Sequence, residues 1–265
     1  MKKTLILLLS LFIFSNIYAE NTFTVYQGVS FIENETRAVT DNNKYYRPGE
    51  VKNLFTEYTK LSANISDIVL PEVTVQFGKD YQNINCSITL QKSITDNITP
   101  FVKGNFKYTN CNIFNDVYGD SYIGVSSKNN IGFVTLNFSG YIGYVFADKV
   151  TLNKTISSDN KNSFITGFEA AVEMEFKNNI NIRLYAGIES FQIFMPSYFV
   201  FWPNEINNTI GASFKWTSNS GFGFFADIEH FCLHPEKPWR PVNTNYYNSE
   251  KTVITAGVSF AFGNN

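Results

Sequence analysis

The closing segment of the chain, residues 251–262, alternates strictly between a larger, apolar set of side chains and a smaller, more polar set. A period of two is that of a β-strand whose two faces meet different surroundings. About ten residues of such alternation is the length that a tilted strand needs to cross a bilayer. The segment is therefore predicted to be a membrane-spanning strand whose larger residues share one face: Thr252, Ile254, Ala256, Val258, Phe260 and Phe262.

The same alternation recurs upstream and is interrupted at regular intervals by polar segments. Four of these segments are short and rich in Asn or Ser, which is typical of hairpin turns: 93–97, 127–130, 177–179 and 217–221. Five are longer: 34–53, 109–119, 150–161, 195–206 and 233–249. Short turns at one end and long loops at the other are typical of membrane-spanning up-and-down barrels.

Counting turns back from the C-terminus predicts an all-β fold, a transmembrane antiparallel up-and-down β-barrel of about twelve strands. The expected strands lie near 22–33, 54–65, 69–79, 83–92, 98–109, 119–128, 131–149, 162–176, 180–194, 206–217, 221–232 and 250–262. An even number places both ends of the barrel on the same side of the membrane. Ten strands is the alternative if 54–79 does not form a hairpin.

The first nineteen residues have the pattern of a secretory signal peptide. Lys2 and Lys3 precede the apolar run 5–14, and Ala19 supplies a small residue before a cleavage site. We therefore expect a signal peptide over 1–19 and a single barrel domain over 20–265. No later segment approaches eighteen consecutive apolar residues, so an exported chain that spans a membrane must do so as a closed barrel.

Composition adds two constraints. The net charge is −2, or −4 once the two lysines of the signal peptide are removed, and no basic stripe indicates nucleic-acid binding. The 26 Phe and 15 Tyr residues would supply aromatic girdles at the two membrane interfaces. The sequence indicates no cofactor and no metal site.

The aromatic-ended closing strand, in a chain that begins with an export signal, resembles the C-terminal strand of bacterial outer-membrane β-barrels. The resemblance implies the outer membrane of a Gram-negative bacterium, contact with membrane lipid and lipopolysaccharide, and recognition of the strand ending in Phe262 by the barrel-assembly machinery. It implies a small porin or channel for small polar solutes, or a structural surface barrel. The segments 34–53 and 233–249 are then the expected external recognition surfaces.

Polar faces that point inward would give the barrel a charged lumen. Two interpretations remain open: the charges create a transverse field in a narrow pore, or they pair with one another and fill the interior. The predicted lumen-lining residues are Lys60, Lys103, Lys107, Glu169, Glu173, Glu175, Arg183, Glu189, Lys215, Asp227 and Glu229.

A second candidate site lies on the opposite face of the strand 221–232. His230 and Cys232 share its apolar face, which places an imidazole beside a nucleophile it could activate. The candidate orienting group comes from the next strand or its loop: Asn243, Asn245, Asn248 or Glu250. This arrangement is similar to the lipid-facing His-x-Ser of lipid A deacylase and outer-membrane phospholipase barrels, although Cys replaces Ser and the deacylases have eight strands. The alternative functions are therefore a lipid-acting hydrolase and, if the apolar faces point inward, a soluble periplasmic ligand-binding barrel.

The three cysteines do not define a disulfide framework. Cys86 falls on the apolar face of its strand and is expected to behave as a small hydrophobe. Cys111 and Cys232 both fall near loop ends on one side, which leaves a disulfide between them as an open hypothesis.

Overall fold

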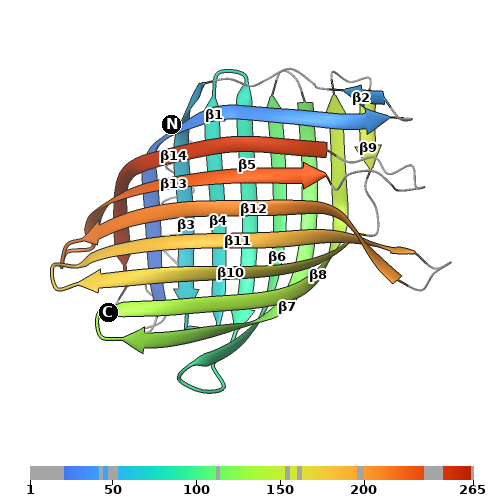
Figure 1. The fold of residues 1–265 in the computed structure, drawn as a ribbon. Coiled ribbons are helices and arrows are strands. Elements are labelled where there is room, and N and C mark those ends of the chain that lie inside the picture. Colours follow the sequence, from blue (N-terminus) through green and yellow to red (C-terminus); the bar gives the residue numbers. More distant parts are fainter. Residues whose placement is uncertain are drawn as a thin grey trace.

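The computed structural model describes residues 21–41, 44–46, 53–111, 114–152, 156–159, 163–195, 200–235 and 247–263. These residues form a single antiparallel sheet (Figure 1). Its strands are β1 (Asn21–Asp41), β2 (Lys44–Tyr46), β3 (Leu54–Ile65), β4 (Val69–Gly78), β5 (Tyr81–Gln91), β6 (Ile98–Cys111), β7 (Phe114–Ile131), β8 (Val134–Leu152), β9 (Ile156–Asp159), β10 (Ser163–Phe176), β11 (Ile180–Met195), β12 (Val200–Thr217), β13 (Phe222–Pro235) and β14 (Tyr247–Phe262). No helix in these ranges has the length and apolar character needed to cross a bilayer.

Twelve of the strands close into a ring. Each strand pairs with its neighbours in chain order, β14 pairs with β1, and β8 pairs with β10, so the ring has no free edge. The short strands β2 and β9 only extend β1 and β8. In Figure 1 the front strands cross the rear strands steeply, as expected when strands tilt strongly from a barrel axis.

The outer wall is apolar and the inner wall is polar. Phe168, Leu184 and Phe224 face outward and are 49%, 48% and 49% exposed, whereas Ser30 and Thr255 face inward and are almost completely buried. Outward aromatic rings also pack in pairs near the strand ends, for example Phe222 with Phe260 at the short-turn end, their ring centroids 5.4 Å apart. This distribution suits a wall immersed in lipid and is the reverse of a soluble ligand-binding barrel.

A hydrogen-bonded belt of buried polar side chains ties several strands together on the inner wall. Ser30 contacts Thr255 across the β1–β14 seam, with 2.7 Å between their hydroxyl oxygens, and accepts a hydrogen bond from Gln76 of β4 at 3.1 Å. Asn83 of β5 donates to Gln76 at 2.8 Å and accepts from Thr109 of β6 at 3.2 Å. Because each buried polar group has a partner, this part of the interior avoids the cost of unsatisfied polar groups.

The strand count of twelve is confirmed, and the ten-strand alternative is wrong because β3 and β4 do pair as a hairpin. The turn predicted at 127–130 is wrong: β7 continues to Ile131, and the chain turns at Gly132, which has a positive φ of 66° that suits glycine. The loops predicted at 109–119 and 195–206 are largely strand. In addition, β4 and β5 are joined by only Lys79 and Asp80 at the end of the barrel where long loops were predicted, so not every connection at that end is long.

The predicted signal peptide, residues 1–19, lies outside the described residues.

The cysteines lie on three different strands of the barrel. Cys86 lies on the outward face of β5, beside the exposed apolar side chains of Ile88 and of Phe106, its register partner on β6. Cys111 is on β6 and Cys232 is on β13, six strands apart in the ring of twelve, which is the opposite wall. Since the Cα atoms of a disulfide lie about 5.5–6 Å apart, the hypothesis of a bond between them is wrong.

Candidate functional site in the barrel lumen

The structure places every predicted lumen-lining residue on the inward face of its strand. This follows from the side-chain alternation: on β10, for example, Glu169 and Glu173 share the face of the buried residues Ile165 and Ala171. The inward set comprises Lys60 on β3, Lys103 and Lys107 on β6, Glu169, Glu173 and Glu175 on β10, Arg183 and Glu189 on β11, Lys215 on β12, and Asp227 and Glu229 on β13.

Arg183 of β11 forms ion pairs with two acidic residues of β10. Its Nη2 atom lies 2.5 Å from Glu169 Oε1, and its Nε atom lies 3.4 Å from Glu173 Oε1. The guanidinium carbon also lies 4.7 Å from the centroid of the Tyr185 ring, within cation–π distance. One arginine therefore neutralises only part of the two carboxylates beside it.

Two tyrosines lie flat along the inner wall, each crossing a glycine to reach a glutamate. Tyr141 of β8 pairs in register with Gly167 of β10, and its hydroxyl donates a hydrogen bond to Glu189 of β11. A Cβ atom added at Gly167 would lie 2.2 Å from the Tyr141 ring. The absence of a side chain at Gly167 therefore lets the tyrosine lie against the wall instead of pointing towards the barrel axis.

The same arrangement repeats two strands further round the ring, since β10 follows β8 there. Tyr185 of β11 pairs with Gly211 of β12, and its hydroxyl donates to Glu229 of β13 at 2.7 Å. A Cβ atom at Gly211 would lie 2.3 Å from the Tyr185 ring. We call these two arrangements the Tyr–Gly–Glu rows.

Two further aromatic–glycine pairs precede the rows. The ring of Phe101 on β6 covers Gly124 of β7, and Gly143 of β8 lies against the Cα and Cβ atoms of Tyr122 on β7. The rings of Tyr122 and Tyr141 stack with their centroids 4.6 Å apart. The rings of Phe101, Tyr141 and Tyr185, on β6, β8 and β11, thus lie sideways over glycines of the wall, which widens the space along the axis.

The charged side chains of the inner wall are partly exposed inside the barrel. The side chains of Arg183, Glu169 and Glu173 are 34%, 40% and 28% exposed although they point into the barrel. Groups packed into a dry interior would be close to fully buried. These ion pairs therefore do not fill the lumen at this level, and the exposed fractions support water beside them.

The charge is unevenly distributed around the lumen. On the inward faces of β10–β13, the described residues supply six carboxylates and only two basic groups, Arg183 and Lys215. The opposite wall holds the predicted lysines, but it also holds three carboxylates that the sequence reading missed, namely Glu72, Asp116 and Asp120. Glu72 pairs with Lys60 at 2.7 Å, and Asp120 accepts hydrogen bonds from Asn105 and Tyr118. We call the inward face of β10–β13 the acidic arc; it is the part of the described lumen with a clear excess of charge.

One basic side chain of the acidic arc is directed away from it. Lys215 of β12 donates a hydrogen bond to the Tyr26 hydroxyl of β1 at 3.3 Å and lies 5.6 Å from the centroid of that ring. Lys60 lies 5.7 Å from the same centroid, and Phe225 packs edge-on against it. Because Lys215 is held at Tyr26, the charge of the acidic arc comes mainly from Asp227 and the glutamates.

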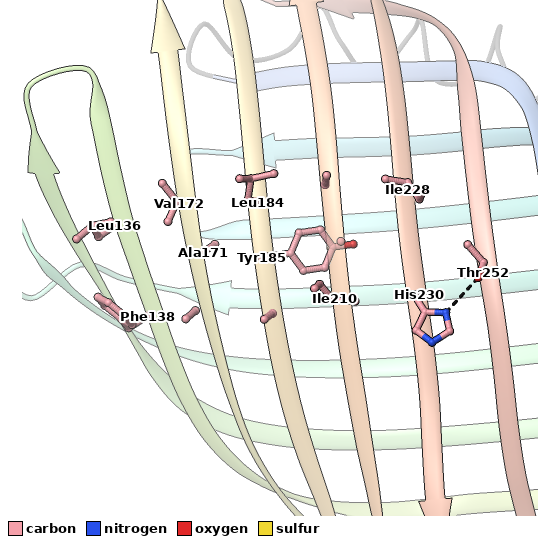
Figure 2. Close-up of a pocket in the computed structure, with 14 residues that line it drawn as sticks. Leu136, Phe138, Ala171, Val172, Leu184, Tyr185, Ile210, Ile228, His230 and Thr252 are labelled. Atoms are coloured by element: carbon pink, nitrogen blue, oxygen red, sulfur yellow. Dashed lines mark hydrogen bonds between the residues drawn. The ribbon is translucent and has the colours of Figure 1, made fainter.

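His230 faces the opposite way, on the outer wall. It lines a hollow of about 590 Å³ whose other lining residues are largely apolar, including Leu184, Ile210 and Ile228 (Figure 2). Its Nδ1 atom lies 3.1 Å from the hydroxyl oxygen of Thr252, its register partner on β14. Cys232 and Glu250 pair in the backbone register two residues further on, but their side chains lie outside the described part of the chain. The imidazole therefore has a hydroxyl partner that the sequence reading did not consider, and its proposed role as a base stays a prediction.

Comparison with known proteins shows the fold but no sequence family. No protein-family model and no curated protein sequence matches the chain. Among solved structures, the NanC porin matches with a TM-score of 0.50 at 9% identity, covering 86% of this chain and 98% of that one. The KdgM porin matches with a TM-score of 0.46 at 7% identity, covering 88% of this chain and 99% of that one. The translocator domain of the autotransporter NalP from Neisseria meningitidis matches with a TM-score of 0.45 at 8% identity, covering 98% of this chain and 95% of that one. The chain is a porin-like β-barrel with twelve wall strands and a polar, charged lumen.

Proposed function

We propose that the protein is a small outer-membrane channel that passes small polar solutes and prefers cations. The observation that carries this proposal is the partly exposed acidic arc, six carboxylates against two basic groups on the described inward faces of β10–β13. A ring or arc of carboxylates raises the local concentration of cations and lowers that of anions in a narrow aqueous path. The Tyr–Gly–Glu rows support conduction because they keep large side chains on the wall.

Single-channel recording of the purified protein in planar bilayers tests this function. Wild type should show discrete conductance steps and, in a KCl gradient, a reversal potential that favours K⁺. Glu173→Gln should lower the preference for K⁺ by about two- to fivefold, because one unit charge at about 4 Å contributes on the order of 1 kcal/mol even in water.

Two control variants make this result specific. Glu173→Asp keeps the charge and should retain the wild-type preference. Asp96→Asn removes a carboxylate from an exposed turn outside the wall and should also change little. If the wild-type protein inserts but produces no steps, or prefers Cl⁻, the channel proposal is wrong.

The location and partners of the barrel belong to the same proposal. The apolar outer wall supports residence in the outer membrane of a Gram-negative bacterium, in contact with its lipid and lipopolysaccharide. The strand β14 ends in Phe262 and closes the ring against β1, which supports its recognition by the barrel-assembly machinery. Fractionation of expressing cells, with the protein in the outer-membrane fraction and heat-modifiable on gels, tests both the location and the assembly.

A further inference from the structure

Gln27 is a polar side chain in the middle of the lipid-facing wall. The outward face of β1 carries Phe23, Val25, Gln27, Val29 and Phe31, so Gln27 lies four residues from an aromatic ring in each direction. At about 3.3 Å per residue and a tilt of about 40°, four residues rise about 10 Å, which places Gln27 near the centre of an apolar band about 25 Å tall. Gln27 is exposed there, as is Val29 at 58%.

Within the described barrel, the side-chain oxygen of Gln27 has a hydrogen-bond partner and its Nε2 group does not. Thr59, its register partner on β3, donates a hydrogen bond from Oγ1 to Gln27 Oε1 at 2.9 Å. The Nε2 group has two further donors, and neither reaches a residue that the structure describes. Hydrocarbon offers no acceptor, so leaving these donors in lipid is costly.

We propose that this part of the outer wall is a contact between two copies of the chain, with Gln27 of each copy at a twofold axis normal to the membrane. Such an axis brings the same residue of both copies to the same depth. A primary amide is its own complement, because each Nε2 can donate to the Oε1 of Gln27 of the partner subunit. The oxygen has a second lone pair for this bond, since Thr59 uses only one. Val29 and Leu61 are the apolar outward neighbours of Gln27, Val25 is only 8% exposed, and the exposed Glu57, register partner of Val29, also faces outward beside them.

The choice of a second copy over lipid follows from depth and chemistry. Lipid acceptors lie at the ester and headgroup level, about 12 Å from Gln27 on either side, whereas a symmetric copy presents an amide at the level of the unsatisfied donors. Polar side chains that hydrogen-bond across membrane-spanning segments contribute about 0.6–2 kcal/mol each, and the twofold arrangement makes two such bonds. This inference rests on the membrane-embedded outer wall and does not depend on conduction through the lumen.

Disulfide cross-linking in outer membranes of expressing cells tests the contact. The native residues Cys86, Cys111 and Cys232 are replaced by Ser, and Gln27→Cys is compared with Ile142→Cys. Ile142 faces outward, is 62% exposed, and lies on β8, six strands from β1 in the ring. On mild oxidation, Gln27→Cys should form a cross-linked dimer at least about tenfold faster than Ile142→Cys, as expected for a contact held by two buried hydrogen bonds.

A second variant separates assembly from folding. Gln27→Leu is compatible with a lipid-facing strand, so it should stay heat-modifiable and keep the wild-type single-channel steps, while its protein mass in lipid nanodiscs falls from that of a dimer to that of a monomer. Cross-linking of Gln27→Cys no faster than that of Ile142→Cys, or a dimeric mass for Gln27→Leu, would overturn the proposal. Failure of wild type to conduct would leave these readouts unaffected and would count only against the channel.

Discussion

The variant Gly257→Val should fail to close the barrel. Gly257 of β14 pairs with Gly28 of β1 at the seam where the two ends of the sheet meet. A Cβ atom at Gly257 would lie 2.2 Å from the backbone oxygen of Gln27 and 2.6 Å from the Cα atom of Gly28. Because both contacts are with backbone, a side-chain rotation cannot relieve them, and the strands must separate. The expected cost is at least about 3 kcal/mol, the upper end of the usual range for overpacking.

Heat-modifiable migration and urea unfolding of protein refolded into detergent or lipid measure this effect. Gly104→Val on β6 is the matched control, since the only atom near its added Cβ would be the Asp120 oxygen at 3.9 Å. The control should fold as wild type does, because valine favours strands. A folded, wild-type-stable Gly257→Val protein would show that the seam is not packed as described.

Alanine at Gly167 or Gly211 should narrow the lumen without preventing closure. The added Cβ would meet the ring of Tyr141 or Tyr185, and a ring can swing away where backbone cannot. The displaced tyrosine loses its glutamate acceptor and projects towards the axis. Single-channel conductance should fall in each variant and fall further in the double variant, with a loss of about 1–2 kcal/mol in stability.

Second-site variants identify the cause of the narrowing. Tyr141→Ala added to Gly167→Ala should restore the conductance, because the obstructing ring is gone. Gly140→Ala, on the outward face of β8 with its nearest atom 4.0 Å away, should conduct as wild type does. Unchanged conductance in the Gly167→Ala/Gly211→Ala double variant would contradict the proposed role of the Tyr–Gly–Glu rows.

Much of the barrel could be predicted from the sequence because lipid and water impose a period of two on each strand. That period alone assigns Phe168 to one face and Glu169 to the other, whichever strands lie beside them. The strand ends were less predictable: the polar run 127–130 resembles a turn, yet Asn130 stays in the ladder and accepts a hydrogen bond from Thr135 at 2.9 Å. A polar run indicates that a turn is near, but the exact position of this turn is set by Gly132, which adopts a positive φ.

Specific side-chain contacts between strands could not be predicted from the sequence. Tyr141 meets Gly167 only because the turns and the β8–β10 connection set that register, and a shift by one residue would move either partner to the other face. Glu72 was missed for a related reason: β4 contains Pro71 and alternates weakly, so its inward face was not recognised. The outward direction of His230 followed from its strand, whereas its contact with Thr252 required the β13–β14 register.

The orientation of the two faces is the claim on which the lumen, its charge and the outer contact all depend, and cysteine labelling along β8 tests it most directly. In membranes carrying the protein without its three native cysteines, single cysteines at 136, 137, 138 and 139 are treated with a water-soluble, membrane-impermeant thiol reagent. Asn137→Cys and Ser139→Cys, which face the hydrated lumen, should be modified, while Leu136→Cys and Phe138→Cys, which face lipid, should be protected. Labelling of 136 and 138 with protection of 137 and 139, or uniform labelling of all four, would contradict the account.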